Sequence, residues 1–331
     1  MGNTDQYIVG VDLGGTSINV GVVSLDGATV AGLRSMPTES DRGAKFVVDR
    51  MIEMIKASMA EAQKEAAISD GGILGIGLGA PGPLDRVAGT VIESPNLGWR
   101  NFPLRDLIAN AIGLEAVLDN DANAAALGEW WVGAGRNVDT LVGITLGTGI
   151  GGGIVLSGRV FHGAGGIAGE IGHTTIDSTG RKCKCGNYGC LEAYASGPAI
   201  AARAIEGLES GEVSTLAQLA GGTLANVTAE TVFEAIVEGD EYARDVMRDT
   251  AHFLGIGIAN VINVLNPEMV VISGGVTRAG EYLFEPLRRE VRKRAFRNAA
   301  DSCRIVSSDL GVTAGVIGAA CTFRVERLDA E

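Results

Sequence analysis

Apolar residues along the chain form short β-branched runs, which alternate with longer segments in which apolar residues recur at helical spacing. The runs at 7–11 and 18–23 are separated by a glycine turn, which predicts a β-hairpin. Residues 44–67 place Met51 and Ile55 on one face, which predicts a helix whose methionines fill the core. The chain is therefore expected to begin with a hairpin followed by an amphipathic helix.

The same alternation of strands and helices continues to the end of the chain. Predicted strands cover 73–78, 116–118, 140–146, 152–156 and 269–273, and predicted helices cover 122–130, 198–208, 231–238, 241–265, 281–297 and 314–328. The segments VDLGGTSINVGVV (11–23) and ITLGTGIGGGIVL (144–156) share the pattern strand, glycine-threonine turn, strand, which indicates an internal duplication. We therefore expect a mixed α/β architecture in two halves.

Composition narrows the class of protein. The 331 residues suit two domains, and 46% hydrophobic against 20% charged residues favours a buried core. Acidic residues number 40 and Lys plus Arg 27, and the net charge of −13 argues against nucleic acid and against an anionic membrane as partners. The longest apolar stretch, 253–265, is too short to cross a bilayer, and no secretory signal precedes residue 7. Five cysteines, an odd number, favour a reduced, cytoplasmic chain.

Glycine is about twice as frequent as usual, and it clusters in turns that suit phosphate binding. The turn at Gly14, Gly15 and Thr16 exposes backbone N–H groups beside a hydroxyl, as does the turn at Thr148 and Gly149. This is the chemistry of a phosphate nest, although a plain tight hairpin is the alternative for either turn alone. No GxxxxGK[ST] sequence occurs, so neither turn is a P-loop.

Two further features adjoin predicted strand ends. Asp12 ends the first strand, where a carboxylate is suited to hold Mg²⁺ directly or through water. Gly274 and Gly275 follow the strand at 269–273, where small residues leave room for a base or a ribose. A plain strand-to-helix turn is the alternative for these two glycines.

Three polar residues, Asp119, Asn120 and Asp121, follow the strand at 116–118 and precede an alanine-rich helix. An Asp at this junction is suited to accept the proton of a hydroxyl group during phosphoryl transfer. A simple helix N-cap is the alternative.

The cysteines contain the most specific signal. Cys183, Cys185 and Cys190 lie within eight residues, and His173 lies ten residues before the first of them. Three thiolates and one imidazole form a closed tetrahedral Zn²⁺ site, which is normally structural. Reduced thiols without a metal are the alternative. Zinc here would shape the loop at 163–195 without taking part in a reaction.

Together these motifs resemble the ROK family of repressors and sugar kinases, and within it the bacterial ATP-dependent glucokinases. The similarity covers essentially the whole chain, and its most specific parts are DLGGT (12–16), LDNDANAAALGE (118–129), TLGTGIGGG (145–153), GEIGH (169–173) and CKCGNYGCLE (183–192). The resemblance implies a two-lobed actin/hexokinase-type (ribonuclease H-like) fold with an active-site cleft between the lobes. It implies one lobe of 1–119 plus 316–331 and a second of 120–315.

The resemblance also implies roles for individual residues. Asp121 would be the general base acting on the 6-hydroxyl group of a sugar. The sugar hydroxyls would bind Asn96, Asn120, Asp121, Glu170, His173 and Glu192. The phosphates of Mg-ATP would bind Gly14, Gly15, Thr16, Thr148 and Gly149, and its adenosine Gly274 and Gly275. His173 would serve both zinc and the sugar.

The function implied is ATP-dependent phosphorylation of glucose to glucose 6-phosphate by a homodimer or a dimer of dimers. The motifs leave open a kinase for fructose, allose, N-acetylglucosamine or N-acetylmannosamine, and polyphosphate as the donor. A sugar-responsive repressor is a further alternative, but the first hairpin begins at residue 7 and leaves no room ahead of it for a DNA-binding domain. His162 and His252 are expected to be structural, with no partner assigned.

Overall fold

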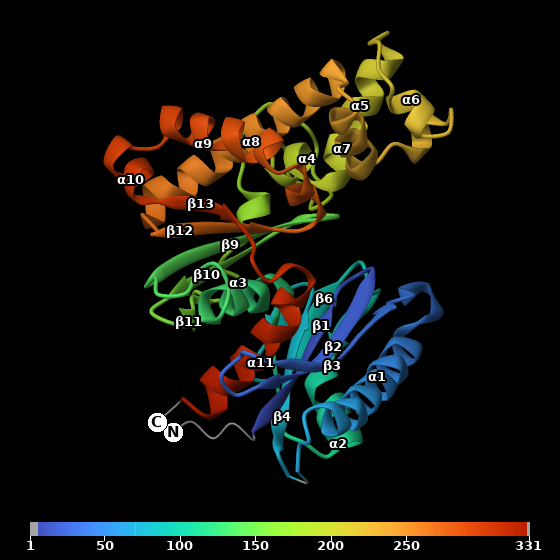
Figure 1. The fold of residues 1–331 in the computed structure, drawn as a ribbon, viewed down its shortest axis with the longest axis vertical. Coiled ribbons are helices and arrows are strands. Elements are labelled where there is room, and N and C mark those ends of the chain that lie inside the picture. Colours follow the sequence, from blue (N-terminus) through green and yellow to red (C-terminus); the bar gives the residue numbers. More distant parts are fainter. Residues whose placement is uncertain (1–5, 70, 330–331) are drawn as a thin grey trace. The chain divides into compact units, whose positions relative to one another are not determined.

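The computed structural model describes residues 6–69 and 71–329 (Figure 1). The chain is a mixed α/β protein that divides into two compact units. Unit 1 comprises Met1–Gly143, Gly153–Gly169 and Ser308–Glu331, and unit 2 comprises Ile144–Gly152 and Glu170–Ser307. The expected α/β architecture in two halves is confirmed. The lobe bounds 1–119 with 316–331, and 120–315, stay a prediction.

Unit 1 contains a five-stranded sheet in the order β3-β2-β1-β4-β8. Its strands are β1 (Tyr7–Leu13), β2 (Ser17–Ser24), β3 (Val30–Pro37), β4 (Ile73–Ala80) and β8 (Ala116–Asn120). The predicted hairpin of β1 and β2 is confirmed, and β4 pairs parallel with both β1 and β8. The carboxyl ends of β1, β4 and β8 meet at one edge of the sheet. Asp12 of β1 and Asn120 of β8 therefore both lie at this edge.

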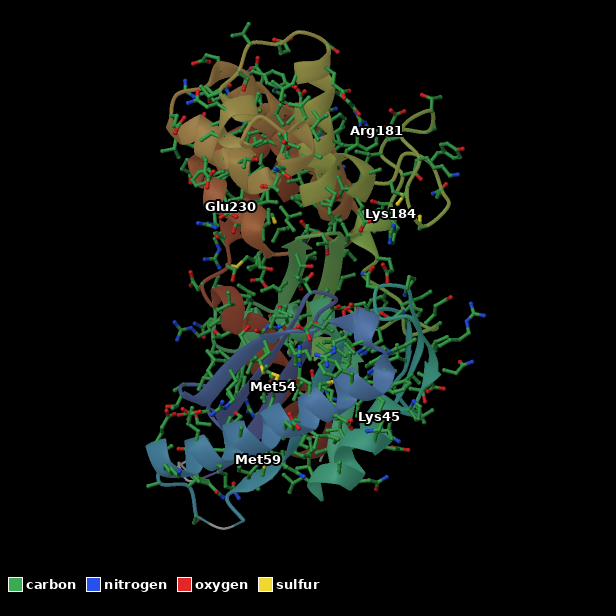
Figure 2. All side chains as sticks on the ribbon, turned by 90° about the vertical axis from the view of Figure 1, so that its right-hand side faces the viewer. Lys45, Met54, Met59, Arg181, Lys184 and Glu230 are labelled. Carbon is green, nitrogen blue, oxygen red and sulfur yellow. The ribbon has the colours of Figure 1, made fainter. Side chains whose placement is uncertain are left out.

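One face of this sheet is covered by α1 (Ala44–Glu65) and α2 (Leu104–Ile112). Val9 of β1 lies in the same buried cluster as Met51 and Met54 of α1. Figure 2 labels Met54 on this helix. The predicted helix with core-filling methionines is therefore confirmed.

The opposite face of the sheet is covered by α11 (Ala314–Arg327). Because successive side chains of a strand point to opposite faces, Ile8 packs with Val316 of this helix rather than with α1. Gly10 is required here, since an added Cβ would collide with the carbonyl oxygen of Val316. Helix α3 (Asp121–Trp131) packs against α11 in turn. Gly318 of α11 lies against the backbone of Ala124 and Gly128, so α11 holds the helix that follows Asn120.

A separate sheet of three short antiparallel strands follows β4 in sequence. Its strands are β5 (Leu84–Asp85), β6 (Thr90–Ser94) and β7 (Trp99–Phe102). This sheet, β3 and α2 were not predicted, because the segments are short or expose many of their side chains. The turn between β6 and β7 carries Asn96.

The second five-stranded sheet has the order β11-β10-β9-β12-β13. Its strands are β9 (Thr140–Leu146), β10 (Ile150–Leu156), β11 (Arg159–Val160), β12 (Met269–Ser273) and β13 (Arg304–Ser307). The bounds predicted for β9 and β12 are confirmed. β10 begins two residues before its predicted start, and β11 and β13 were not predicted because each spans four residues or fewer.

The helices of unit 2 are α4 (Glu192–Ala195), α5 (Gly197–Glu209), α6 (Leu216–Leu219), α7 (Ala229–Val237), α8 (Glu241–Leu265), α9 (Glu281–Arg294) and α10 (Arg297–Ser302). The bounds predicted for α8 are confirmed. The prediction of one helix over 281–297 was wrong at its end. Ala295 is extended, and the N–H of Phe296 donates to Asn263 Oδ1 at 2.7 Å instead of continuing the helix.

The described residues also contain short 3₁₀ helices, namely η1 (Ser40–Arg42), η2 (Ile171–His173), η3 (Leu224–Asn226), η4 (Gly275–Ala279) and η5 (Gly311–Thr313). Within residues 6–69 and 71–329, no helix is both long enough and apolar enough to span a bilayer.

Candidate functional site

The junction between β8 and α3 carries the polar residues predicted to do chemistry. Asn120 has an extended backbone and caps α3, since its Oδ1 accepts hydrogen bonds from the N–H groups of Ala122 at 2.9 Å and Asn123 at 3.2 Å. Asp121 is the first residue of the helix, and its Oδ1 also accepts from the N–H of Ala122, at 2.9 Å. The N-cap is therefore Asn120, and the alternative reading of Asp121 as the N-cap was wrong.

The first glycine turn is closed by its own backbone. The N–H of Gly14 donates to the carbonyl oxygen of Ser17 at 2.8 Å, and Thr38 Oγ1 donates to the carbonyl oxygen of Gly14 at 2.7 Å. A Cβ added to Gly15 would lie 3.1 Å from Cβ of Asn96. The structure thus brings a residue predicted to bind phosphate beside one predicted to bind sugar.

Asp12 is the second-to-last residue of β1, just before this turn, and Thr16 of the turn is exposed. Asn19 Nδ2 donates to Asp12 Oδ2 at 3.0 Å. Gly315 of α11 lies so close to the Asp12 carboxylate that any side chain there would collide with it. Burial raises the pKa of Asp12, although the hydrogen bond from Asn19 opposes the shift. The carboxylate is therefore held in a poorly solvated place, where a cation would favour its charged form.

The second glycine turn belongs to unit 2, and it is tied to two other segments of that unit. The N–H of Gly147 donates to the carbonyl oxygen of Gly149 at 3.0 Å, and the N–H of Gly197 donates to the carbonyl oxygen of Gly147 at 2.9 Å. The N–H of Ile150 donates to Glu192 Oε2 at 3.0 Å. A Cβ on Gly149 would lie 2.5 Å from this carboxylate oxygen, so a side chain there would displace the end of Glu192 from the N–H of Ile150.

A cavity of about 610 Å³ lies in unit 2 beside this turn. Gly147 and Thr148 of the turn form part of its wall, and Gly275 of η4 and Phe233 of α7 form other parts. Most of the lining is apolar, which suits a flat ring with few polar contacts. Gly274 has a different role, because at φ 99° it packs on the carbonyl oxygen of Leu146, where a Cβ would collide.

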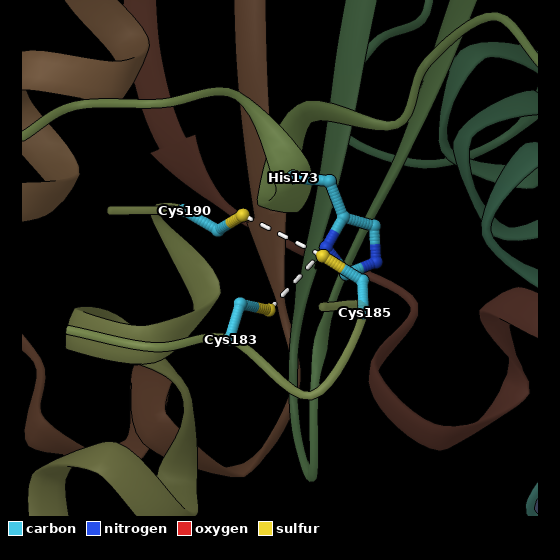
Figure 3. Close-up of side chains that lie close together, drawn as sticks. All are labelled: His173, Cys183, Cys185 and Cys190. Atoms are coloured by element: carbon cyan, nitrogen blue, oxygen red, sulfur yellow. Dashed lines mark hydrogen bonds between the residues drawn. The ribbon is translucent and has the colours of Figure 1, made fainter. Parts of the chain in front are cut away.

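The four side chains predicted as metal ligands lie together (Figure 3). The ligand atoms of His173, Cys183, Cys185 and Cys190 are all within 4.8 Å of one another. His173 Nδ1 is 3.7 Å from Cys183 Sγ, and the Sγ atoms of Cys185 and Cys190 are 3.7 Å apart. These separations suit four ligands around one tetrahedral ion.

The chemistry of the four groups also fits zinc. In the absence of a cation, burial raises the pKa of Cys183 to about 12 and raises that of Cys190, whereas the backbone N–H of Asn187 lowers that of Cys185. Only a cation at the centre of the cluster would hold all three sulfurs as thiolates. Since His173 turns Nδ1 toward the sulfurs, its Nε2 is left for another partner.

The residues predicted to bind sugar fall into two groups. Glu170 is exposed just before η2, His173 ends that 3₁₀ helix, and Glu192 begins α4, all in unit 2. Glu192 Oε1 lies 3.8 Å from Cys183 Sγ, so this carboxylate is next to the cysteine cluster. The other three predicted residues, described above, belong to unit 1.

Two buried carboxylates have contacts that the sequence did not predict. Asp119 is 1% exposed, and its Oδ2 lies 2.8 Å from Nε2 of His162, which supplies the partner that sequence could not assign. Glu129 is 2% exposed and accepts hydrogen bonds from the N–H groups of Ala134 at 2.9 Å and Leu310 at 3.1 Å. Asp119 and His162 are 43 positions apart, and Glu129 and Leu310 are 181 positions apart, so no local pattern signals these two contacts.

Comparisons with known proteins cover nearly the whole chain. The sequence pattern described as the ROK family matches residues 8–326. A glucokinase of Halalkalibacterium halodurans is 40% identical over 316 residues, which are 95% of this chain and 94% of that protein. A xylose repressor of Caldicellulosiruptor bescii is 34% identical over 312 residues, which are 94% of this chain and 76% of that protein.

A solved structure agrees with these relatives. The ROK family glucokinase from Streptomyces griseus, in complex with glucose and AMPPNP, matches with a TM-score of 0.82 and 34% identity. The match covers 95% of this chain and 98% of that one. The two-lobed actin/hexokinase-type fold implied by the resemblance is thereby confirmed.

Proposed function

The chain belongs to the ROK family, and on that premise we propose that it is a kinase that transfers the γ-phosphoryl group of ATP to the 6-hydroxyl group of glucose. The observation that carries the proposal is the position of Glu192. This carboxylate is bonded to the glycine turn beside the cavity and lies next to the cysteine cluster with His173. A nucleotide in the cavity and a hydroxyl group at Glu192 would therefore be held by one connected set of residues.

Asp121 is the proposed general base. Its carboxylate stands at the first position of α3, where the Asn120 cap fixes the backbone on which it is mounted. As the 6-hydroxyl oxygen attacks the γ-phosphorus, Asp121 would accept the hydroxyl proton. The bond between the γ-phosphorus and the β,γ-bridging oxygen would break, so that ADP leaves.

The two glycine turns are the proposed phosphate ligands. Gly14, Gly15 and Thr16 in unit 1, and Thr148 and Gly149 in unit 2, would offer backbone N–H groups and hydroxyls to phosphate oxygens. Asp12 would hold Mg²⁺, which when bound neutralises phosphate charge during the transfer. Such preorganised donors stabilise the charge of the transition state.

The cavity beside Thr148 is the proposed adenosine site. Its apolar walls, with Phe233 and Val276 among them, suit the faces of a purine. Gly275 leaves space in the wall, and Gly274 sets the backbone that carries it. ATP is therefore the proposed donor in preference to polyphosphate, which has no ring to occupy such a cavity.

The sugar would be recognised through paired hydrogen bonds. We assign Asn96, Asn120, Glu170, His173 and Glu192 to its hydroxyl groups, with Asp121 at the reacting one. When a bound sugar covers these amides and carboxylates, a sugar that lacks a hydroxyl is rejected, because one of them would be left without a partner. Acetamido sugars and other hexoses are the alternative substrates within the same reaction.

Zinc is proposed as a structural ion. His173, Cys183, Cys185 and Cys190 would hold it, and it would supply a cross-link between η2 and the loop that leads to α4. Through this link the ion would fix Glu192 and the ring of His173 without contacting the phosphates.

A sugar-responsive regulator is the second candidate, and one observation favours it. The xylose repressor of Caldicellulosiruptor bescii matches almost the whole of this chain. A protein of that kind would bind a sugar without phosphorylating it. Formation of a sugar phosphate therefore distinguishes the two candidates.

The test is identification of the product. The protein is incubated with ATP, Mg²⁺ and glucose, and phosphorus NMR is used to detect glucose 6-phosphate. A parallel sample contains 6-deoxyglucose, which lacks the reacting hydroxyl and should give no sugar phosphate. Glucose 6-phosphate in the first sample alone supports the proposal, and binding of glucose without any phosphorylation would favour the regulator.

A further inference from the structure

Asp119 is a carboxylate buried almost completely, one residue before the Asn120 cap. Its Oδ1 accepts hydrogen bonds from the N–H of Asn120 at 2.7 Å and from Asn123 Nδ2 at 3.2 Å. Its Oδ2 lies 2.8 Å from His162 Nε2. A buried carboxylate lowers stability unless donors surround it. These contacts therefore stabilise the folded junction between β8 and α3.

The two oxygens of this carboxylate face different groups. Oδ1 faces the start of α3, where it holds the residue that caps the helix and a residue in its first turn. The N–H of Asn123 also donates to Asn120 Oδ1, at 3.2 Å, which closes a small ring of bonds. Asp121 lies between Asn120 and Asn123, so the backbone that carries it is fixed at both sides.

Oδ2 faces two side chains from segments distant in sequence. His162 follows β11, and Arg86 follows β5, with its Nε 3.6 Å from Asp119 Oδ2. Arg86 also forms an ion pair with Glu326 of α11. All four residues belong to unit 1. The Asp119 carboxylate therefore links the side chains of His162 and Arg86 to the start of α3.

His162 Nε2 is within hydrogen-bond distance of Asp119 Oδ2, whereas Arg86 Nε lies beyond it at 3.6 Å. Among the described residues, Arg86 Nε and Asn123 Oδ1 are already buried without a hydrogen-bond partner. A carboxylate only accepts hydrogen bonds, so His162 Nε2 carries the proton of the shared bond. If that donor is removed, Asp119 Oδ2 loses its hydrogen bond to His162. The carboxylate that accepts the N–H of Asn120 is then held less firmly.

We propose that Asp119 and His162 form a positioning pair for phosphoryl transfer. His162 holds Asp119, Asp119 holds the backbone of Asn120 and the first turn of α3, and this turn aims the carboxylate of Asp121. Neither member of the pair contacts the substrate. The inference rests on the proposed function, because it assigns the pair to the reaction that Asp121 is proposed to catalyse.

The test uses two variants of the full chain and a matched control. His162→Leu removes the donor, and His162→Gln keeps an N–H donor on a side chain of similar reach. The control is His252→Leu, since His252 of α8 also pairs with a carboxylate, Glu290, at 3.4 Å, but belongs to unit 2, whereas the proposed base belongs to unit 1.

We expect His162→Leu to lower kcat by about 10- to 100-fold, which is the cost of a small misplacement of a reacting group. The KM for ATP should stay unchanged, because the cavity assigned to adenosine belongs to unit 2. His162→Gln should recover most of kcat, and His252→Leu should match the unaltered protein. A merely structural role would lower thermal stability without lowering kcat per folded molecule.

Amide hydrogen exchange gives a second readout that does not depend on turnover. His162→Leu should accelerate exchange in the peptide that covers the start of α3, while the peptides of α8 should exchange as before. Unchanged exchange at α3, or kcat equal to that of His252→Leu, would overturn the inference while leaving the proposed function intact. Absence of phosphoryl transfer by the unaltered protein would overturn both, and exchange would still report whether the pair holds the helix.

Discussion

Glu192 Oε2 accepts a hydrogen bond of 3.0 Å from the backbone N–H of Ile150. This bond joins the first residue of α4 to the first residue of β10, directly after the second glycine turn. Glu192 Oε1 also lies 3.8 Å from Cys183 Sγ. A change in the cysteine cluster would therefore shift Glu192 and alter its hydrogen bond to the turn. The proposed zinc and the proposed phosphate ligands are therefore connected through one side chain.

The first prediction concerns the base. Asp121→Asn should lower kcat by about 100-fold to about 10,000-fold, since an amide cannot accept the hydroxyl proton. Binding of the sugar, measured by calorimetry, should largely survive because the amide still forms hydrogen bonds. Asp106→Asn is the matched control, since Asp106 lies in the first turn of α2 and is exposed. Turnover near that of the control would remove Asp121 from the role of base.

The second prediction concerns the cysteine cluster. Cys185→Ala should lose bound zinc, measured by elemental analysis of the purified protein, and should lose thermal stability and activity together. The reason is that only three of the four ligands remain and η2 is no longer cross-linked to the loop before α4. Cys303→Ala is the control, because Cys303 is a buried cysteine outside the cluster. A variant free of metal and fully active would contradict the zinc assignment.

The third prediction separates the stability and the function of Asp12. Burial raises its pKa, so the folded state holds the proton more tightly than the unfolded chain does. The contribution of protonated Asp12 to the free energy of unfolding is therefore fully present below the unfolded pKa of 3.8. It is lost as the pH rises through the higher pKa of the folded state. Asp12→Asn should therefore raise the melting temperature near pH 7.5 more than at pH 4, when both are measured without added Mg²⁺.

The same variant tests the proposed magnesium ligand. Asp12→Asn should raise the Mg²⁺ concentration needed for half-maximal activity, because a neutral amide is a weaker ligand than a carboxylate. A gain in stability together with a loss in Mg²⁺ affinity would mark Asp12 as a residue retained for function. An unchanged Mg²⁺ titration would show that Asp12 is not a magnesium ligand.

The fourth prediction concerns the cavity of unit 2. Ala201 lies in its wall, so Ala201→Phe should fill part of the space and raise the KM for ATP by about tenfold or more, which is a loss of about 1.4 kcal/mol or more of binding. Binding of the sugar alone should be unaffected. Val213→Phe, at a position 93% exposed, is the control. An unchanged KM for ATP would move the adenosine site elsewhere.

Local patterns were sufficient for much of the fold. The bounds of α8 follow from apolar periodicity and from Asn266 and Pro267, which end the helix. The end of α9 was not predictable, because its stop depends on a hydrogen bond from Phe296 to Asn263, a residue of another helix. Strands β5 to β7 were missed since each is short and carries many exposed side chains.

The candidate site shows the same division. His173 and the three cysteines lie within 18 positions, so their spacing was enough to predict that they meet. Asp119 and His162 are 43 positions apart, and the pairing depends on how β11 and β8 are brought together by the tertiary fold. Sequence alone gave no reason to prefer Asp119 over any other acidic residue as the partner of His162.

The measurement that tests the central claim most directly is a sugar panel. Release of ADP from Mg-ATP is followed with glucose, mannose, fructose, N-acetylglucosamine and N-acetylmannosamine, and kcat/KM is compared among them, with Asp121→Asn as the inactive reference. We predict the highest kcat/KM for glucose, and a loss of that activity in the reference. ADP release with none of the sugars from folded, zinc-loaded protein would contradict the proposal that this chain is a sugar kinase.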